Sequence, residues 1–379
     1  MSKASDKKVF RLANHSKAKI ECYCNYLRIY LSILANAPFD NIYILDLFAG
    51  EGKDIDNVSC SSVAAAEAIR DHYNSGKTSC KKITFELNDS GNSVIEPGFK
   101  KIDRVKRFID ELHLPNSVQT TYSNSPFEDI IDTVIRKMNA LKSNERALCF
   151  IDPFGYKYSK PEKLKSILQN GRTEVLLFIP ICFMHRFAAK AVNDDSFTEG
   201  KHIEEFLSVL FQNKIPELGS QISFIKKIQQ QFKIFLNVPY VREMYIEKDK
   251  NQYFALFFFS NNKLGFEKML EAIWKIDEKS GKGFTVSMNS VNPGLFDNID
   301  HESYTKLLFD EIKRNKKMSN QEIFDFGLKN NHLPKHSNKV LTELRKEKKI
   351  KATFENGDNA LAFYINDGHQ NKIFVTSII

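Results

Sequence analysis

The chain has 379 residues, enough for two or three domains with a full hydrophobic core. Its composition, 42% hydrophobic and 27% charged, is ordinary for a soluble globular protein, and its apolar runs are too short or too interrupted for a transmembrane helix. Lys and Arg number 55 against 47 Asp and Glu, and this net charge of +8 permits a polyanionic partner without requiring one.

The first half of the sequence alternates between helix-length and strand-length segments. Apolar residues at helical spacing predict a first helix over 16–35, and an apolar run predicts a first strand over 42–46. Further strands are predicted at 82–88, 118–122, 147–151 and 174–181, separated by helices at 56–73, 105–112, 127–141 and 160–169. This alternation predicts an α/β fold, a doubly wound parallel sheet with right-handed crossovers.

A glycine-bearing loop, residues 46–52, follows the first strand. Gly50 and Gly52 have no Cβ, so the turn can tighten and the backbone can approach a ligand. A strand, a glycine turn and a helix are how an open α/β sheet binds a nucleotide-like cofactor. Asp46 is expected to fix the loop or to face the cofactor, and Phe48 belongs to the same candidate site. The alternative is a glycine turn that binds nothing.

Polar residues near the next two strand ends are further candidates for cofactor contacts. Glu86 lies in the second predicted strand, and an acid at such a strand end can accept hydrogen bonds from both ribose hydroxyls. Asn124 follows the third strand and is the candidate for the adenine contact. The alternatives are a solvated acid for Glu86 and an ordinary loop residue for Asn124.

The fourth predicted strand runs directly into Asp152-Pro153-Phe154-Gly155. The Asp152 carboxylate and the Pro153 carbonyl can both accept hydrogen bonds from an exocyclic amine, which would orient the nitrogen lone pair for reaction. Phe154 can stack on an extruded base. The alternative is a turn in which Asp152 caps the next segment and Phe154 belongs to the core.

The strand–helix rhythm breaks after the fifth strand. A helical insertion is predicted at about 185–238, followed by a strand hairpin at 240–247 and 252–260 and a helix at 265–278. Gly, Pro and Asn residues make 280–300 the best linker candidate. We therefore predict one domain over residues 1–290 and a second over 300–379.

The second domain has the pattern of a winged helix. Helices are predicted at 301–314, at 320–329 after a Ser319–Glu322 capping box, and at 338–347 after an N-cap at Ser337. Short strands at 351–354 and 360–365 would form the wing. Basic residues cluster around the last helix and suit nucleic-acid binding, with a solvated or protein-binding surface as the alternative. These candidates are Lys335, Lys339, Arg345, Lys346, Lys348 and Lys349.

The cysteines and histidines suggest no metal or hydrolase site. The six cysteines are scattered, and no His or Cys pair completes a zinc site. We interpret them as reduced thiols of a cytoplasmic protein. The nine histidines lack the local signature of a Ser/His/Asp or Cys/His centre.

The Asp-x-Phe-x-Gly-x-Gly pattern of residues 46–52 resembles the first motif of S-adenosylmethionine (SAM) methyltransferases. With blocks at Lys19, Phe85-Glu86, 152–155 and 253–256, the chain resembles the three-Cys-motif partner proteins (TcmP) over roughly residues 16–280. The resemblance implies a Rossmann-like SAM-methyltransferase domain followed by a winged helix-turn-helix domain, SAM as cofactor, and a partner with a three-cysteine motif similar to radical-SAM proteins.

Two departures from that family fall in the cofactor loop and the helix after it. Glu51 stands where the family usually has Pro, and Ser61-Ser62 stands where it usually has Ser-Pro. Separately, the motif at 152–155 is similar to that of tRNA guanine-N2 methyltransferases, and distantly to the Asp-Pro-Pro-Tyr motif of DNA amino-methyltransferases. Both groups methylate exocyclic base amines.

These features lead to two functional hypotheses. The first is a SAM-dependent methyltransferase that acts on an exocyclic base amine of RNA or DNA, with Asp152, Pro153 and Phe154 as its catalytic residues. The second is a non-catalytic methyltransferase-like scaffold that binds nucleic acid or a partner protein.

Overall fold

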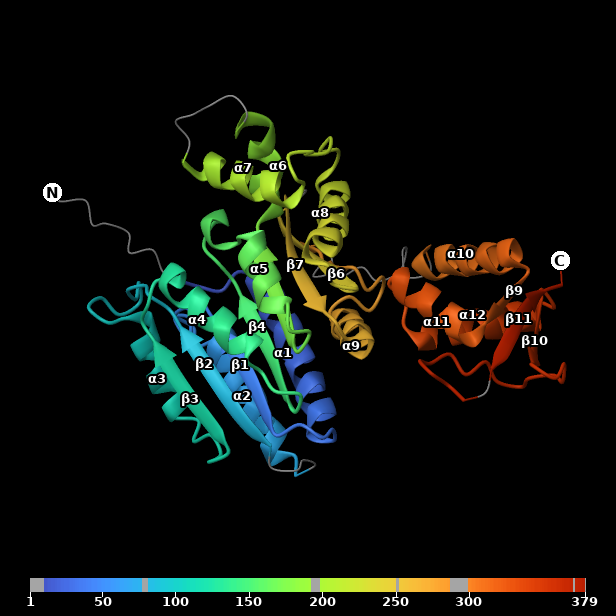
Figure 1. Cartoon of the computed structure of the whole chain (residues 1–379), viewed down its shortest axis with the longest axis horizontal. Coiled ribbons are helices and arrows are strands. Elements are labelled where there is room, and N and C mark those ends of the chain that lie inside the picture. Colours follow the sequence, from blue (N-terminus) through green and yellow to red (C-terminus); the bar gives the residue numbers. More distant parts are fainter. Residues whose placement is uncertain are drawn as a thin grey trace. The chain divides into compact units, whose positions relative to one another are not determined.

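The computed structural model describes residues 10–76, 81–191, 198–249, 252–286, 299–370 and 372–378. The chain forms two compact units (Figure 1). Unit 1 comprises Met1–Ala272 with Phe284–Val286, and unit 2 comprises Ile273–Gly283 with Ser287–Ile379. Of the predicted linker at 280–300, residues 287–298 lie outside the described residues.

An eight-stranded mixed sheet with the order β3-β2-β1-β4-β5-β7-β6-β8 forms the centre of unit 1. Strands β1 to β5 are parallel, and β7 runs antiparallel to its neighbours β5 and β6. The strands are β1 (Asn41–Asp46), β2 (Lys82–Asn88), β3 (Val118–Ser123), β4 (Glu145–Ile151), β5 (Thr173–Ile179), β6 (Tyr240–Asp249), β7 (Gln252–Ser260) and β8 (Gly283–Phe284). The chain winds outward from β1 in both directions, so the topological switch point lies between β1 and β4. The predicted doubly wound, Rossmann-like fold is confirmed.

Helices cover both faces of this sheet (Figure 1). Helices α1 and α3 both contact α2, whereas α5 contacts both α4 and α8. On the face of α1, Tyr23 stacks on Phe150 of β4 with ring centroids 4.4 Å apart, and Tyr26 meets Phe258 of β7 edge-on at 4.8 Å. The helices are α1 (Asn14–Ala35), α2 (Ser61–Asn74), α3 (Lys101–Asp110), α4 (Phe127–Asn139), α5 (Pro161–Leu168), α6 (Ile181–Ala191), α7 (Thr198–Leu210), α8 (Gln221–Leu236) and α9 (Lys263–Trp274).

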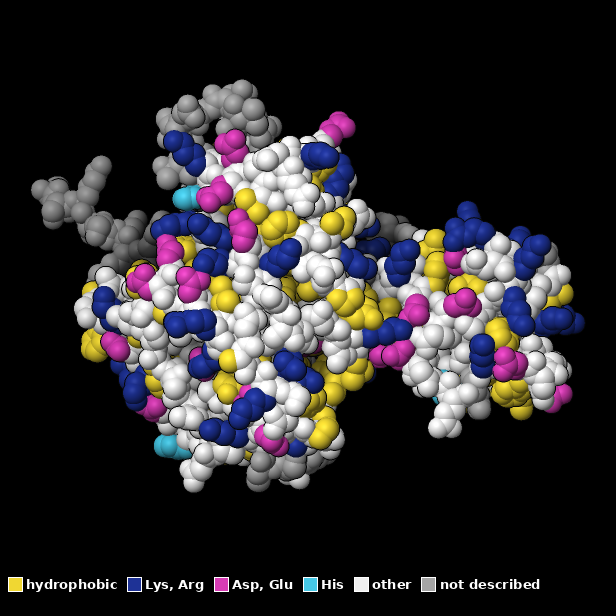
Figure 2. Space-filling model, viewed as in Figure 1, with side chains coloured by type: hydrophobic (Ala, Val, Ile, Leu, Met, Phe, Trp, Pro, Cys, Tyr) yellow, Lys and Arg dark blue, Asp and Glu magenta, His cyan; other side chains and the backbone are white. Residues whose placement is uncertain are grey.

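Charged side chains are spread over the surface of both units. In the view of Figure 2, Lys and Arg side chains are interspersed with acidic ones rather than gathered in one patch. The net positive charge by itself therefore does not mark a binding face on this side of the molecule.

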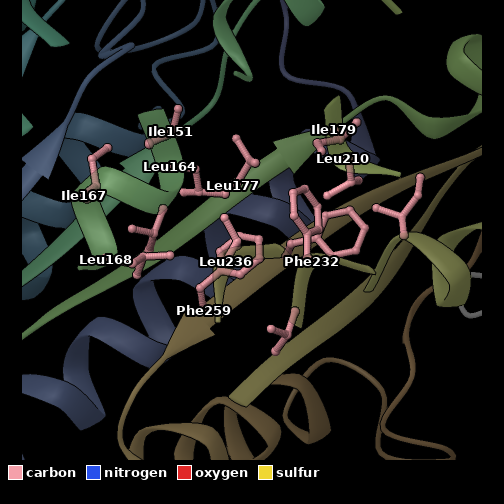
Figure 3. Close-up of a cluster of buried hydrophobic side chains, with 14 of the residues drawn as sticks. Ile151, Leu164, Ile167, Leu168, Leu177, Ile179, Leu210, Phe232, Leu236 and Phe259 are labelled. Carbon is pink, nitrogen blue, oxygen red and sulfur yellow. The ribbon is translucent and has the colours of Figure 1, made fainter. Parts of the chain in front are cut away.

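The face of the sheet opposite α1 carries a continuous hydrophobic core. Ile151 of β4, Leu177 of β5 and Phe259 of β7 belong to one buried cluster with side chains of α5, α7 and α8 (Figure 3). Phe232 and Leu236 are the α8 contributions labelled there. Burying each such side chain stabilises the fold by about 1.5–3 kcal/mol. This core holds the parallel strands in register and so positions the loops at their carboxyl ends.

Two predicted boundaries in unit 1 are wrong for local reasons. Helix α2 begins at Ser61 rather than near residue 56, because the Asp54 carboxylate accepts hydrogen bonds from the backbone N–H groups of Asp56 and Val58 and holds a turn there. Strand β5 ends at Ile179, two residues early, because Pro180 has no N–H to donate to the sheet. Helices α6, α7 and α8 follow, between β5 and β6, where a helical insertion was expected.

Unit 2 contains the predicted three helices and a small antiparallel sheet of order β10-β11-β9. The capping box at α11 is present as predicted, since the Ser319 hydroxyl accepts from the Glu322 N–H and the Glu322 carboxylate accepts from the Ser319 N–H at 2.7 Å. The elements are α10 (Ile299–Asn315), β9 (Lys317–Ser319), α11 (Asn320–Lys329), α12 (Pro334–Lys346), β10 (Ile350–Phe354) and β11 (Ile373–Ser377).

Two other predictions for unit 2 are wrong. Helix α12 begins at Pro334, whose fixed φ suits the first helical position, so Ser337 lies inside the helix, where its Oγ is 2.6 Å from the Tyr304 hydroxyl. Residues 360–365 form no strand, and Tyr364 has a φ of 48°, which interrupts extended backbone. The partner of β10 is instead β11, a segment further along the chain.

Candidate functional site

A cavity of about 190 Å³ opens at the carboxyl ends of β1 and β2, beside the start of α4 and the loop after β4. This is the edge of the sheet and the switch point at which doubly wound folds bind ligands. Its lining includes Phe48, Asp89, Lys101, Phe127, Phe154 and Tyr158.

Asp46 closes β1 and anchors the glycine loop. Its side chain is fully buried; Oδ1 accepts a hydrogen bond from the Phe48 N–H at 3.1 Å, and Oδ2 accepts one from the Ser61 hydroxyl at 2.7 Å. Burial raises the pKa of the Asp46 carboxyl to about 7, against the lowering effect of these two hydrogen bonds. Asp46 thus performs the loop-fixing role, one of its two predicted roles, and it does not line the cavity.

The two glycines of the loop are required for different reasons. Both have left-handed backbone, with φ of 67° at Gly50 and 76° at Gly52. A Cβ on Gly50 would meet nothing closer than 4.0 Å, and its N–H donates to the Asp89 carboxylate at 2.9 Å. A Cβ on Gly52 would lie 2.9 Å from the Phe108 ring. Gly50 therefore shapes the turn beside the cavity, whereas Gly52 permits close packing against α3.

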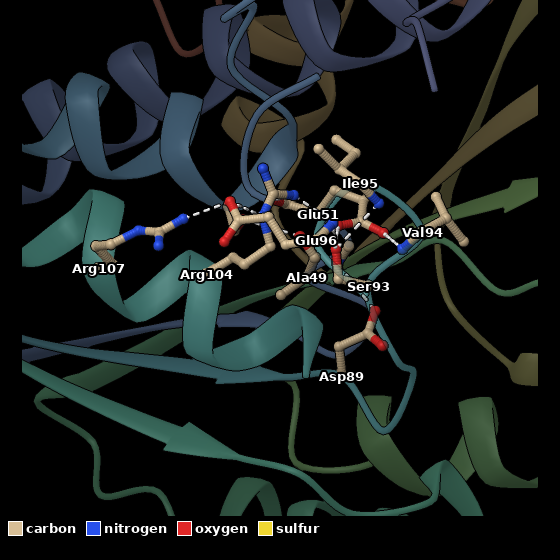
Figure 4. Close-up of polar contacts among 11 residues, drawn as sticks. Ala49, Glu51, Asp89, Ser93, Val94, Ile95, Glu96, Arg104 and Arg107 are labelled. Carbon is tan, nitrogen blue, oxygen red and sulfur yellow. Dashed lines mark hydrogen bonds and ion pairs between the residues drawn. The ribbon is translucent and has the colours of Figure 1, made fainter. Parts of the chain in front are cut away.

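Glu51 is the centre of a buried polar cluster (Figure 4). Its carboxylate is 2.6 Å from the Arg104 guanidinium, and the two side chains are only 2% and 3% exposed. Glu51 also accepts hydrogen bonds from the Ser93 hydroxyl at 2.8 Å and from the Val94 N–H at 2.7 Å. Arg104 extends the cluster to Glu96 at 2.9 Å. Glu51 therefore binds the glycine loop to the loop after β2 and to α3.

The serine pair at the start of α2 supports the same loop. Ser61 donates to Asp46, as described above, and the Ser62 hydroxyl donates to the Ala49 carbonyl at 2.9 Å. Both side chains are buried. The serine pair thus also holds the glycine loop in place.

Glu86 does not lie at the strand end, where a ribose contact was expected. Strand β2 continues to Asn88, and Glu86 is paired in register with Leu45, which places it on the face of α4, where it forms an ion pair with Lys137. The acid that follows the strand is Asp89, which the sequence interpretation missed because it placed Glu86 at the strand end, although the predicted strand already reached residue 88. Asp89 is buried, accepts from the N–H groups of Gly50 and Gly91, and lines the cavity.

Asn124 also lies away from the cavity, on an exposed loop after β3. The nearby amide that holds this loop is Asn88, at the end of β2. Its side chain accepts from the Ser125 N–H at 3.2 Å and donates to the Leu47 carbonyl at 3.3 Å. Asn88 therefore connects the loops after β1 and β3, and its side chain forms part of the cavity wall.

The motif at 152–155 follows β4 directly, as predicted. Asp152 forms an ion pair with Lys19 of α1, whose ammonium group lies 4.0 Å from the centre of the Phe178 ring. Pro153 is buried, whereas Phe154 is 74% exposed at the cavity, with the Lys101 ammonium 5.0 Å from its ring centre. Phe154 is thus not a core residue.

Phe48 forms an aromatic wall with two other rings. Its ring stacks on Phe127 with centroids 5.0 Å apart, and the Tyr158 ring lies 5.7 Å away. All three residues line the cavity. A planar group bound there would meet ring faces and edges rather than charged side chains on this side.

The basic candidates in unit 2 divide into two groups. Lys335, Lys339 and Lys346 are exposed and recur at helical spacing, so they form one stripe on α12. Arg345 instead donates to the Leu361 carbonyl at 2.8 Å and lies over the Phe363 ring, so its position secures the segment after β10. Lys348 is exposed beyond the helix, and Lys349 pairs with Glu347 at 2.7 Å.

A comparison with protein-family models finds a match in the C-terminal part of the chain. Residues 288–357 match the model of the GMT-like wHTH domain. This match confirms the predicted winged helix-turn-helix domain. No curated protein matches the chain.

Several solved structures are similar to this chain at low sequence identity. The O-methyltransferase from Bacillus cereus in complex with SAH is 13% identical over 63% of this chain and 80% of its own, with a TM-score of 0.30. A putative O-methyltransferase from Klebsiella pneumoniae is 12% identical over 67% and 93%, with a TM-score of 0.31. The hMettl16 catalytic domain in complex with a 3′UTR hairpin is 9% identical over 68% and 78%, with a TM-score of 0.29.

Three further observations concern metal sites, membrane-spanning helices and cysteines. Within the described ranges, no group of three His, Cys, Asp or Glu side chains is arranged to hold a metal ion. In the same part of the chain, no helix combines the length and the apolar character needed to cross a bilayer. The cysteines Cys22, Cys24, Cys60, Cys149 and Cys182 are buried free thiols, and Cys80 lies outside the described residues.

Proposed function

We propose that the chain is a SAM-dependent methyltransferase that acts on an exocyclic base amine of RNA or DNA, and that its wHTH domain holds the nucleic acid. One observation carries the proposal: Phe48 of the glycine loop, Asp89 after β2 and Phe154 of the loop after β4 line one cavity at the switch point of the sheet. A cofactor loop, an acid after the second strand and a substrate loop are the parts that such an enzyme requires.

The residues present suit SAM. Asp89 accepts two backbone hydrogen bonds, and because a carboxylate offers about four acceptor positions, it can also accept from ribose hydroxyls. The aromatic wall of Phe48, Phe127 and Tyr158 suits the adenine ring. When bound, SAM supplies an electrophilic methyl group. Asp46 contributes indirectly, because it holds the glycine loop in place.

The substrate side rests on Asp152 and Pro153. Lys19 contacts Oδ2 of Asp152, and no donor among the described residues contacts Oδ1. A base amine can therefore donate to Oδ1 and to the Pro153 carbonyl together, which aims its lone pair away from both acceptors. The exposed Phe154 ring can stack on the same base.

The lysine stripe on α12 supports a nucleic-acid substrate, because three exposed ammonium groups on one helix face suit a phosphate backbone. The three-cysteine-motif partner belongs to the proposal only through the resemblance of the sequence blocks. A cytoplasmic location is proposed on the scattered, free thiols.

Binding of SAH, the demethylated product, tests the cofactor site by isothermal titration. We expect the wild-type protein to bind and Asp89→Ala to weaken binding about tenfold or more, since a ribose hydrogen bond to a charged group is lost. Glu86→Ala is the matched control, and it should bind as wild type does, because Glu86 pairs with Lys137 on the α4 face. A folded protein without affinity for SAH, or equal binding by Asp89→Ala, would contradict the proposal.

The scaffold hypothesis has its own support. The cavity of about 190 Å³ is smaller than the roughly 300–1,000 Å³ of ordinary ligand pockets, so Phe154 and Lys101 at its lining would have to move for a complete cofactor. Transfer of a labelled methyl group from SAM to RNA or DNA oligonucleotides separates the two functions. Nucleic-acid binding without transfer, by a protein that does not bind SAH, would favour the scaffold.

A further inference from the structure

A second cavity, of about 290 Å³, lies at the opposite edge of the sheet in unit 1. It is surrounded by the second half of α1, the starts of β4 and β5, the end of β7 and the start of α9. Arg146 lies near the start of β4 and Asp152 directly after its end, six positions further along the chain and about 20 Å away. The cavity is therefore separate from the proposed cofactor site and needs its own explanation.

A buried acid forms the polar floor of this cavity. The Glu174 carboxylate accepts hydrogen bonds from the Tyr26 hydroxyl at 2.5 Å and from the Ser260 hydroxyl at 2.6 Å. Gly265 approaches so closely that a Cβ there would lie 2.2 Å from the carboxylate. These contacts hold Glu174 in one position, so the floor is preformed rather than flexible.

Tyr30 lines the cavity with an unused polar group. The residue is 7% exposed, and its hydroxyl is buried without a hydrogen-bond partner in the described part of the chain. An unpaired buried hydroxyl is unfavourable by about 1–3 kcal/mol. The hydroxyl oxygen has almost no accessible surface, so a ligand could accept from it only after neighbouring side chains shift.

Two guanidinium groups also line the cavity without acidic partners. Arg146 donates to the Ser143 and Glu145 carbonyls and lies 4.0 Å from the centre of the Phe39 ring. Arg172 donates to the Leu141 carbonyl at 3.2 Å. Neither forms an ion pair with any described residue, whereas Lys268 beside them is neutralised by Glu267 and Glu271. Glu174 lines the same cavity, but burial raises the pKa of its carboxyl to about 7, so at neutral pH the two guanidinium groups carry more charge than this acid and attract an anion.

We propose that this cavity binds a small organic anion, one carboxylate or phosphate group attached to an apolar body. Arg146 and Arg172 hold the anionic group, and a guanidinium matches the two oxygens of either head group. Ile33, Leu34 and Leu264 contact the apolar body, and Tyr30 lies beside it. The site is independent of the proposed methyltransferase activity.

Isothermal titration with benzoate and with phenyl phosphate tests the site and distinguishes the head groups. We expect saturable one-to-one binding of at least one of them, with weaker binding of inorganic phosphate, which lacks the apolar body. Arg146→Ala and Arg172→Ala should each weaken binding about tenfold or more, because a charge-assisted contact is lost. Lys142→Ala removes the same charge from an exposed position nearby and should bind as wild type does.

A cavity-filling variant keeps the test independent of folding. Leu264 is 42% exposed, so Leu264→Trp can enter the cavity without disturbing the core, and it should abolish probe binding while the thermal unfolding midpoint is retained. Saturating SAH should not displace the probe, which distinguishes this site from the proposed cofactor site. Failure of both aromatic anions to bind a folded protein, unchanged binding in both arginine variants, or displacement by SAH would each overturn the proposal.

Discussion

The carboxylate of Glu51 lies 2.6 Å from the guanidinium of Arg104, and both side chains are almost fully buried. This ion pair connects the glycine loop after β1 to α3 across 53 residues of sequence. Attraction between two desolvated charges depends on close geometry and on satisfied hydrogen bonds, and both conditions are met here.

Removal of Arg104 should therefore be strongly destabilising. We expect Arg104→Ala to lower the free energy of unfolding by about 3–5 kcal/mol, since it leaves the Glu51 carboxylate buried without a counter-charge. The matched control is Arg70→Ala, which breaks the more exposed pair with Asp71 and should cost less than about 1 kcal/mol. Urea denaturation measures the free energy of unfolding of both variants. Equal losses would show that the buried ion pair stabilises the protein no more than the exposed one does.

The two glycines of the loop should respond differently to a single methyl group. Gly50→Ala and Gly52→Ala impose similar backbone strain, because both residues have positive φ. Only at Gly52 does the added Cβ also collide with Phe108. We expect Gly50→Ala to cost about 1 kcal/mol and Gly52→Ala about 1–3 kcal/mol more. Thermal and urea unfolding provide the comparison, and Phe108→Ala should rescue part of the Gly52→Ala loss but none of the Gly50→Ala loss.

The buried Asp46 should make stability depend on pH. Burial raises the pKa of its carboxyl from 3.8 to about 7 in the folded state, so between about pH 4 and 7 the folded protein retains a proton that the unfolded chain releases. The stabilising contribution of Asp46 is therefore full below pH 4 and is lost as the pH rises to 7. We expect the wild-type protein to lose stability relative to Asp46→Asn over this range, measured by urea unfolding at each pH.

Glu96, whose pKa shifts in the opposite direction to that of Asp46, provides the control for that experiment. Hydrogen bonds from Arg107 and Arg104 lower the pKa of Glu96 below its ordinary value of 4.5. Its contribution to stability is present above pH 4.5 and is lost as the pH falls. Glu96→Gln should therefore be least stable relative to wild type near neutral pH. If both variants shifted in the same direction with pH, these explanations would be wrong.

The lysine stripe on α12 should determine the salt dependence of nucleic-acid binding. When the logarithm of the association constant for B-DNA is plotted against the logarithm of the salt concentration, each phosphate contact makes the slope more negative by roughly 0.9. Lys339→Ala combined with Lys346→Ala should thus reduce the slope by about 2. Lys306→Ala combined with Lys313→Ala removes the same charge from exposed positions on α10 and should change it little. Fluorescence anisotropy at about 50–300 mM salt measures the slopes. Equal slopes for the two double variants would show that the nucleic acid does not bind along the lysine stripe.

The sequence by itself determined the strand–helix alternation, the glycine turn, the motif after β4 and the capping box of α11. These features are local, because each depends on residues within one or two turns or strands. The sequence by itself did not show that Glu86 pairs with Lys137 or that Asp89 lines the cavity. The position of Glu86 depends on the register of β2 against β1, which pairs Glu86 with Leu45 and turns it toward α4.

Only the tertiary structure decided the contacts between distant segments. Lys19 meets Asp152, Glu51 meets Arg104, and β10 pairs with β11 rather than with the nearer segment at 360–365. The second cavity likewise brings together Tyr30 of α1, Arg146 of β4 and Arg172 of the turn before β5. Local periodicity predicts which element a residue occupies and which face it shares, but the energy of a buried charge or hydroxyl depends on what the packed chain brings within about 3 Å of it.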